Sequence, residues 1–405
     1  MERIVVIGAG QAGASLALKL RAGGFTGAIT LLGGEPDPPY QRPPLSKGYL
    51  LGEMTRERLL LKPAEAYAAA GIELRTGVEV TAIDRTAREV VCADGARVGY
   101  DALALTLGAT PRPLPAAVTG GRAGVFTIRT LADIDALADS VAPGQRALVV
   151  GGGYIGLEAA AVARKLGLDV TLVEMADRLL SRVASVETAT WFAALHRAEG
   201  VDLRLGTGLG HLTGTGRVTG AVLSDGTEIA ADVVIAGIGV TPNTALAEAA
   251  GLALDNGIAV DTTGRTSDPA IWAAGDCASF PWRGARIRLE SVQNAIDQAE
   301  SVAVNMLGEM SDYDPVPWFW SDQYGVKLQI AGLGTGHDFV AVRAGAREGT
   351  VSHWYFRDGA LIAVDAMNDP RAYMVGKRMI EAQARPDPRL IADPAADLKA
   401  LMTAA

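Results

Sequence analysis

Short apolar runs that lead into glycine mark this chain at two places. Residues 4–7 and residues 148–150 are continuously apolar, as expected of parallel strands buried on both faces, and each run precedes a glycine-rich stretch and a helix start. After the first run, the pattern predicts a crossover helix at residues 15–22 and a second strand at residues 29–32, parallel to the first. The chain is therefore predicted to contain βαβ units and to have an α/β fold.

The pattern changes near residue 314. Residues 315–324, rich in proline and aromatic side chains, are predicted to form a junction between domains. A small antiparallel sheet should follow, with a turn at Asp358-Gly359 and a covering helix at residues 371–384. Its predicted strands are residues 328–331, 339–342, 351–356 and 361–364.

Length and composition set the class of protein. A chain of 405 residues, of which 49% are hydrophobic and 20% charged, is expected to form two or three domains. No apolar run approaches the ~20 residues of a membrane span, and a strand that starts near Arg3 leaves no room for a signal peptide, so we expect a cytoplasmic protein without a membrane partner. The net charge of −9 argues against nucleic acid as a partner, because phosphate binding needs a basic surface.

The two glycine-rich stretches have the form GxGxxG. In such a motif the first glycine makes the tight turn, the second lets the backbone approach a pyrophosphate, and the third lets the helix pack on the strand. The helix start that follows offers free N–H groups to a phosphate. Two copies about 140 residues apart predict two dinucleotides on one chain. The motif glycines are Gly8, Gly10 and Gly13 in the first copy and Gly151, Gly153 and Gly156 in the second.

Carboxylates follow both motifs at the distance expected for a ribose-binding acid. Glu174 ends an apolar run 18 residues after Gly156, and Glu35 lies 22 residues after Gly13. A carboxylate at Glu174 accepts hydrogen bonds from a 2′-hydroxyl but repels a 2′-phosphate, which predicts NADH rather than NADPH. The alternative is that Glu174 is only a solvated strand end.

The segment between the motifs carries further charges. Prolines restrict the backbone of residues 38–47, where Arg42 can neutralise a pyrophosphate and Lys47 can present an ammonium group to an electron-rich ring. A solvated, proline-rich connection is the alternative.

The two glycine motifs, with Tyr-Gln-Arg-Pro-Pro-Leu-Ser-Lys at residues 40–47, resemble the FAD-containing, NADH-dependent ferredoxin reductases of bacterial oxygenase systems, in the glutathione reductase-like superfamily. The resemblance covers nearly all 405 residues. It implies two Rossmann-like domains, one for FAD and one for NAD, and a small C-terminal α+β domain. The implied ranges are 1–112 and 245–314 for the FAD domain, 113–244 for the NAD domain and 315–405 for the C-terminal domain.

The resemblance also implies roles for single residues. Lys47 would lie close to the isoalloxazine and form an ion pair with Glu158, on the first turn of its helix, while Tyr154 would cover the nicotinamide pocket. Gly34 replaces one member of the family's acidic pair beside Glu35. The other implied FAD contacts are Arg42, the backbone of Thr106 and Gly108, Asp276 at the ribityl chain and Trp320 near the flavin edge. Gly239 would lie near the nicotinamide.

Side chains for thiol or metal chemistry are few. Cys92 and Cys277 lie far apart in the sequence, and the four histidines have no ligand spacing, so neither a CxxC pair nor a metal site is expected. The resemblance to disulfide reductases does not extend to their CxxxxC. Without a thiol relay, electrons should leave singly to a [2Fe–2S] ferredoxin that serves a cytochrome P450 or a Rieske oxygenase.

Three alternatives remain open at this point. A rubredoxin reductase would share nearly every motif, an NADH-sensing flavoprotein of the apoptosis-inducing-factor type would turn over slowly, and an NADH oxidase would reduce oxygen without a partner. Docking of an acidic ferredoxin would need local positive charge. The candidates, which could equally be a solvated face, are Arg56, Arg58, Lys62, Arg283, Arg286 and Arg288.

Overall fold

The computed structural model describes residues 1–404 and divides into two compact units. Unit 1 comprises Met1–Arg42, Thr55–Thr110 and Val240–Pro315. Unit 2 comprises Pro43–Met54, Pro111–Gly239 and Val316 to the end of the described chain. The proline-rich segment is therefore divided, with Arg42 in unit 1 and Lys47 in unit 2.

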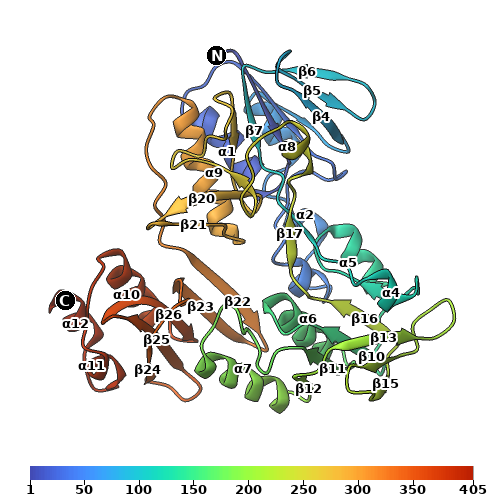
Figure 1. Ribbon diagram of the computed structural model, residues 1–405, viewed down its shortest axis with the longest axis vertical. Coiled ribbons are helices and arrows are strands. Elements are labelled where there is room, and N and C mark those ends of the chain that lie inside the picture. The colour runs from blue at the N-terminus through green and yellow to red at the C-terminus, as the bar shows by residue number, and fades with distance from the viewer. Residues whose placement is uncertain (405) are drawn as a thin grey trace. The chain divides into compact units, whose positions relative to one another are not determined.

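Unit 1 is built on a five-stranded parallel sheet of order β19-β7-β1-β2-β3. Alternation along β1 (Arg3–Ile7) sends Ile4 and Val6 to one face, where they pack with helices α1 (Gln11–Ala22) and α9 (Val292–Met306), which lie side by side (Figure 1). Val5 and Ile7 point to the other face. Burial on both faces explains why this strand is apolar throughout. The other strands are β2 (Ala28–Leu32), β3 (Ile72–Arg75), β7 (Ala102–Leu105) and β19 (Ile271–Ala273).

Smaller elements complete unit 1. One three-stranded sheet consists of β4 (Val80–Asp84), β5 (Glu89–Cys92) and β6 (Arg97–Gly99), and another of β18 (Ile258–Ala259), β20 (Ala278–Trp282) and β21 (Ala285–Ile287). The short helices are α2 (Arg56–Leu59), α3 (Ala64–Ala69) and α8 (Ala245–Ala249). The chain leaves unit 1 after Thr110 and re-enters it at Val240. At this point β8 (Ala109–Pro111) pairs with β17 (Val240–Pro242).

Unit 2 contains a second parallel sheet, of order β12-β11-β10-β16-β9. Its strands are β9 (Val125–Phe126), β10 (Arg146–Val150), β11 (Asp169–Glu174), β12 (Asp202–Leu205) and β16 (Val233–Ala236). An antiparallel sheet of β13 (Leu209–Thr213), β14 (Gly220–Leu223) and β15 (Glu228–Ala230) shares a core with it. The helices are α4 (Ala116–Thr119), α5 (Leu131–Ala138), α6 (Tyr154–Lys165) and α7 (Val186–Ala198), with a π-helical turn η1 (Leu45–Tyr49).

The C-terminal part of unit 2 is a five-stranded antiparallel sheet of order β22-β23-β26-β25-β24. Helix α10 (Pro370–Glu381) packs on it (Figure 1). The predicted antiparallel sheet and its covering helix are confirmed, but the prediction of a junction at residues 315–324 was incomplete, because Trp318–Gln323 forms the edge strand β22. The other elements are β23 (Val326–Gly332), β24 (Phe339–Ala344), β25 (Val351–Arg357), β26 (Ala360–Met367), α11 (Pro388–Ala392) and α12 (Leu398–Ala404).

These elements confirm the predicted α/β class, with two parallel sheets and a C-terminal α+β part. Within residues 1–404, no helix combines the length and the apolar character needed to cross a membrane.

Gly376 provides a test of how tightly α10 packs on the sheet. An alanine Cβ at this position would lie 2.6 Å from Val364 Cγ1 and 3.3 Å from the Trp354 ring. Helix propensity alone favours Gly376→Ala by ~1 kcal/mol, whereas overpacking a core costs about 1–3 kcal/mol. We expect the variant to have a lower thermal unfolding midpoint. A higher midpoint would mean that this interface has room for a methyl group.

Candidate functional site

The glycine turn of unit 1 has the geometry of a ligand cradle. A Cβ on Gly8 would lie 2.2 Å from Thr106 O, and one on Gly13 would lie 2.0 Å from Gly8 O. Packing within the protein therefore requires both outer glycines. A Cβ on Gly10 would meet no protein atom within 4 Å, so the protein itself does not require the middle glycine. The free space beside it fits the close approach of a pyrophosphate.

Unit 2 repeats this arrangement. A Cβ on Gly151 would lie 2.5 Å from Gly237 O, one on Gly156 would lie 2.0 Å from Gly151 O, and one on Gly153 would meet nothing within 4 Å. In both units the middle glycine is also the N-cap of the following helix, α1 or α6, and it makes no side-chain capping bond. The leading N–H groups of both helices are thus left to a phosphate.

Glu174 lies against the second glycine turn. Its Oε2 accepts a hydrogen bond of 2.6 Å from Gly152 N, and its Oε1 accepts one of 2.8 Å from Ala176 N. These bonds fix the carboxylate at the end of β11, beside the cradle. Each oxygen has a further lone pair available to a ribose hydroxyl.

In unit 1, Glu35 lies three residues after the end of β2, and it is engaged by cationic and phenolic partners. Arg42 Nη2 lies 2.5 Å from Glu35 Oε1, Tyr40 donates its hydroxyl to Glu35 Oε2, and the Arg42 guanidinium lies 5.1 Å from the centre of the Tyr40 ring. Burial alone would lower the pKa of Arg42, but Tyr40 and Glu35 raise it. The sequence did not reveal this pairing of the two residues assigned separately to FAD.

Asp276 is the only residue of the run 271–280 that is not fully buried. The preceding Gly275 N donates to Gln298 Oε1 at 2.8 Å, which fixes the backbone at the carboxyl end of β19. Thr106 donates its hydroxyl to the carbonyl oxygens of Ile7 (3.0 Å) and Gly8 (2.8 Å), so its side chain supports the glycine turn. The Thr106 side chain thus has a structural role, and its backbone N–H also donates to Ile7 O at 2.9 Å.

Gly108 lies on the segment after Thr106. It has a φ of +67°, and its carbonyl oxygen accepts a 3.0 Å hydrogen bond from Asn243 N. A positive φ is a conformation that glycine adopts at little cost.

The expected ion pair between Lys47 and Glu158 is present in unit 2. Lys47 Nζ lies 2.6 Å from Glu158 Oε2, which also accepts a 3.0 Å bond from Ser46 Oγ, and Glu158 is only 4% exposed. Glu158 Oε1 accepts a 2.7 Å bond from Ser321 Oγ. The expected place of Glu158 on the first turn of its helix was wrong, because it is the fifth residue of α6. The ion pair, rather than the helix dipole, accounts for the buried carboxylate.

Aromatic side chains lie close to the second glycine turn. The rings of Tyr154 and Phe319 are 4.7 Å apart, and those of Phe319 and Trp320 are 6.5 Å apart. The Tyr154 hydroxyl is buried and has no hydrogen-bond partner within residues 1–404, and burial raises its pKa. Gly239, with a φ of +98°, accepts a 2.9 Å bond from Arg112 N through its carbonyl oxygen.

Both cysteines of the chain are free and buried. Burial raises the pKa of Cys92, and it raises that of Cys277 to about 11. Thiols of this kind are poor nucleophiles and poor redox groups at neutral pH. Among the described residues, no three His, Cys, Asp or Glu side chains gather as a metal site would require.

Most of the basic side chains considered for ferredoxin docking are paired within unit 1. Arg56 lies 2.6 Å from Asp37 and Arg288 lies 2.6 Å from Glu290. Arg283 and Arg286 lie 4.0 Å and 3.6 Å from Asp314 and Asp255. Pairing reduces the positive field that these four arginines present.

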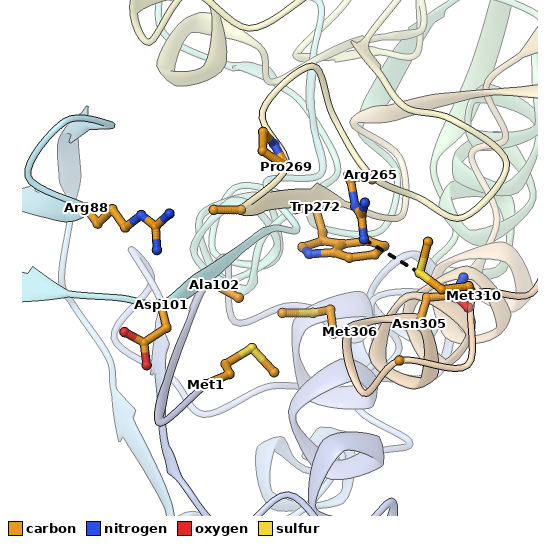
Figure 2. A pocket seen from close by; sticks show the side chains of 12 residues that line it. Met1, Arg88, Asp101, Ala102, Arg265, Pro269, Trp272, Asn305, Met306 and Met310 are labelled. Atoms are coloured by element: carbon orange, nitrogen blue, oxygen red, sulfur yellow. Dashed lines mark hydrogen bonds between the residues drawn. The ribbon is translucent and has the colours of Figure 1, made fainter.

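Unit 1 also has a separate hollow of about 340 Å³ (Figure 2). Arg265 lies over the Trp272 ring, 4.6 Å from its centre, and donates a hydrogen bond to Met310 Sδ. Asp101 and Ala270, which line the hollow, directly precede β7 and β19. The hollow is therefore at the amino ends of the parallel strands, opposite to the edge where nucleotides bind in such sheets.

Comparisons with known proteins agree with this geometry. Residues 2–299 match the family described as pyridine nucleotide-disulphide oxidoreductase, and residues 318–402 match a reductase C-terminal domain. The chain is 46% identical to a ferredoxin–NAD(P)⁺ reductase of a Sphingomonas species, over 99% of this chain and 97% of that protein. It is 41% identical to putidaredoxin reductase of Pseudomonas putida, over 100% of this chain and 97% of that protein.

A solved structure is similar along the whole chain. The crystal structure of the covalent putidaredoxin reductase–putidaredoxin complex matches with a TM-score of 0.96 and 40% identity, and the match covers 100% of this chain and 99% of that one. The resemblance drawn from the sequence motifs is thereby confirmed. The chain belongs to the pyridine nucleotide-disulphide oxidoreductase family and, within it, to the ferredoxin reductases related to putidaredoxin reductase.

Proposed function

We propose that this chain is an FAD-dependent NADH:ferredoxin oxidoreductase, which passes a hydride from NADH to FAD and then single electrons to a [2Fe–2S] ferredoxin that serves a cytochrome P450 or a Rieske oxygenase. The observation that carries the proposal is the pair of glycine turns, each with a middle glycine facing open space, on a chain whose two thiols are both buried. A relative named as a ferredoxin–NAD(P)⁺ reductase, aligned over 99% of the chain, and one named as a putidaredoxin reductase, aligned over 100%, support the class of acceptor.

FAD and NAD(H) are the cofactors that the two turns fit. We assign FAD to the first turn, with Glu35, Arg42, Thr106, Gly108 and Asp276, and NADH to the second turn, with Tyr154, Glu174 and Gly239. Lys47, Glu158 and Trp320 act on the flavin. The corresponding domains are 1–112 with 245–314 for FAD, 113–244 for NAD, and 315–405 at the C-terminus.

The chemistry divides between the cofactor and the chain. Bound FAD supplies the ability to accept two electrons as a hydride and to release them one at a time. The residues of the chain bind and orient: the helix N-termini of α1 and α6 hold phosphates, and Glu174 selects a free 2′-hydroxyl. Hydride transfer needs no proton from the protein, so Lys47 and Glu158 act by charge and position.

The buried cysteines bear on how electrons leave. Since no thiol is available to take two electrons, we expect the electrons to leave one at a time to an external carrier. The cytoplasm supplies NADH and keeps thiols reduced, and we place the activity there.

The acceptor is the most direct test. NADH-driven reduction of a panel of [2Fe–2S] ferredoxins and rubredoxins, each at fixed salt, should be fastest with a ferredoxin and should slow as ionic strength rises. Faster reduction of rubredoxin or of oxygen would contradict the proposal. Slow turnover with every acceptor would favour an NADH-sensing role, and a rate independent of ionic strength would rule out docking by charge.

Coenzyme preference is expected to depend on Glu174. The wild-type protein should have a higher kcat/KM with NADH, and Glu174→Gln should shift the NADPH/NADH ratio of kcat/KM by roughly tenfold or more toward NADPH, because it removes the charge that repels a 2′-phosphate. Asp169→Asn is the matched control, since Asp169 begins the same strand with its side chain 80% exposed. An unchanged ratio in Glu174→Gln would show that this carboxylate does not face the 2′ position.

The absence of a thiol relay predicts that the cysteines are dispensable. The double variant Cys92→Ala/Cys277→Ala should keep kcat for ferredoxin reduction within about twofold per bound flavin, because neither thiol is ionised at neutral pH. Flavin content, read from the visible absorbance, controls for the packing lost at Cys277. A loss of more than about tenfold at full flavin occupancy would require a redox role for sulfur.

A further inference from the structure

A chain of hydrogen bonds continues beyond the Lys47–Glu158 pair, within unit 2. Ser321 Oγ donates to Glu158 Oε1 at 2.7 Å and accepts a 3.1 Å bond from Gln323 Nε2. Gln323 Oε1 is 2.8 Å from His196 Nε2, and His196 Nδ1 is 3.3 Å from the Tyr324 hydroxyl. This series of hydrogen bonds thus runs from His196 on α7 through β22 to Glu158 on α6.

In this series of hydrogen bonds, every donor can direct its hydrogen toward the next member on the Glu158 side. Gln323 presents its amide nitrogen to Ser321, which leaves its oxygen as the acceptor for His196. His196 then donates from Nε2 and accepts from Tyr324 at Nδ1, which is the neutral imidazole. Burial lowers the pKa of His196, against a smaller opposing effect of its bond to Gln323, in agreement with a neutral ring. Aligned bonds of this kind strengthen one another in a low-dielectric interior.

The members of the chain are buried and are matched to one another. Ser321 and His196 are 0% exposed and Gln323 is 1% exposed. Ser321 and Gln323 stand two residues apart on β22, so the strand pleat sends both side chains to the same face. A buried polar group without a partner is costly, so replacing any one of the three side chains would leave a neighbour without its partner.

The backbone conformation at Tyr324 places its side chain beside His196. Tyr324 and Gly325 form the two-residue turn between β22 and β23, with φ values of +51° and +83°. Glycine adopts such angles readily, whereas a tyrosine there is uncommon. The turn places the Tyr324 ring edge-on to His196, 5.0 Å between ring centres.

We propose that Ser321, Gln323 and His196 are positioning residues for flavin reduction: they fix the Glu158 carboxylate so that it holds Lys47 in place. The proposal rests on the proposed function only in assigning Lys47 to the flavin. This series of hydrogen bonds is not a route for protons, because the amide of Gln323 interrupts it.

The test is a double-variant cycle on the holoenzyme, read by rapid reduction of the bound flavin with NADH. Ser321→Ala should slow this single turnover about tenfold, as expected for loss of a hydrogen bond to a charged group, with an unchanged NADH dissociation constant. In a Lys47→Met background the same substitution should change the rate by less than about twofold, because its effect passes through Lys47. Ser321→Thr, which keeps a hydroxyl, should recover most of the rate.

A second readout does not depend on turnover. Competitive labelling of the lysines, followed by mass spectrometry, should show Lys47 becoming several-fold more reactive in Ser321→Ala, while Lys165, which pairs with Glu53 at 2.7 Å, should not change. Gln323→Met should act in the same direction as Ser321→Ala.

The matched control is another buried serine of the same sheet. Ser352 on β25 is 0% exposed and accepts a 2.9 Å bond from Trp354 Nε1. Ser352→Ala should leave both the flavin reduction rate and the Lys47 labelling unchanged. Additive rate effects in the cycle, or unchanged Lys47 labelling in Ser321→Ala, would overturn the proposal. Because flavin reduction needs no acceptor protein, failure to reduce ferredoxin would leave this test intact.

Discussion

A carboxylate buried without partners is among the most costly features that a protein can contain. Glu158 is buried, so unit 2 must supply it with hydrogen-bond and charged partners. Its three donors are Ser46, Lys47 and Ser321, which lie 112, 111 and 163 residues away in the sequence. All three separate stretches of unit 2 therefore meet at one carboxyl group. Within Leu45–Tyr49 the backbone kinks at Lys47 (φ −136°, ψ −113°), and the neighbouring residues Ser46 and Lys47 reach the same oxygen.

In both units, glycines relieve the same steric conflict between a strand and the helix that follows it. A helix that starts directly after a buried strand approaches it closely, and in both copies a Cβ on the third glycine would lie 2.0 Å from the carbonyl oxygen of the first. Packing explains the outer glycines, whereas no protein atom requires the middle ones, and the open space beside them fits a pyrophosphate. The carboxylates differ, since Glu174 bonds to backbone N–H groups and Glu35 to side chains.

The parallel sheets and the Lys47–Glu158 pair were predictable because their signals are local or belong to a motif: continuous apolar runs, glycine spacing, and Lys47 within a recognisable segment. The strand at Trp318–Gln323 was missed because prolines and aromatics hide its alternation. His196 was also missed as a partner of the site, since Gln323 lies 127 residues away and no local pattern links them. Contacts of this kind arise only from tertiary packing.

The interleaving of the units has a consequence for how such proteins diversify. The chain crosses from one unit to the other at residues 42/43, 54/55, 110/111, 239/240 and 315/316. A single recombination event between two related genes would therefore always leave at least one unit as a mosaic of both parents. Exchanging the nucleotide-binding segment 111–239 alone requires two breakpoints, and the new segment must still accept a lysine and two serines encoded outside it.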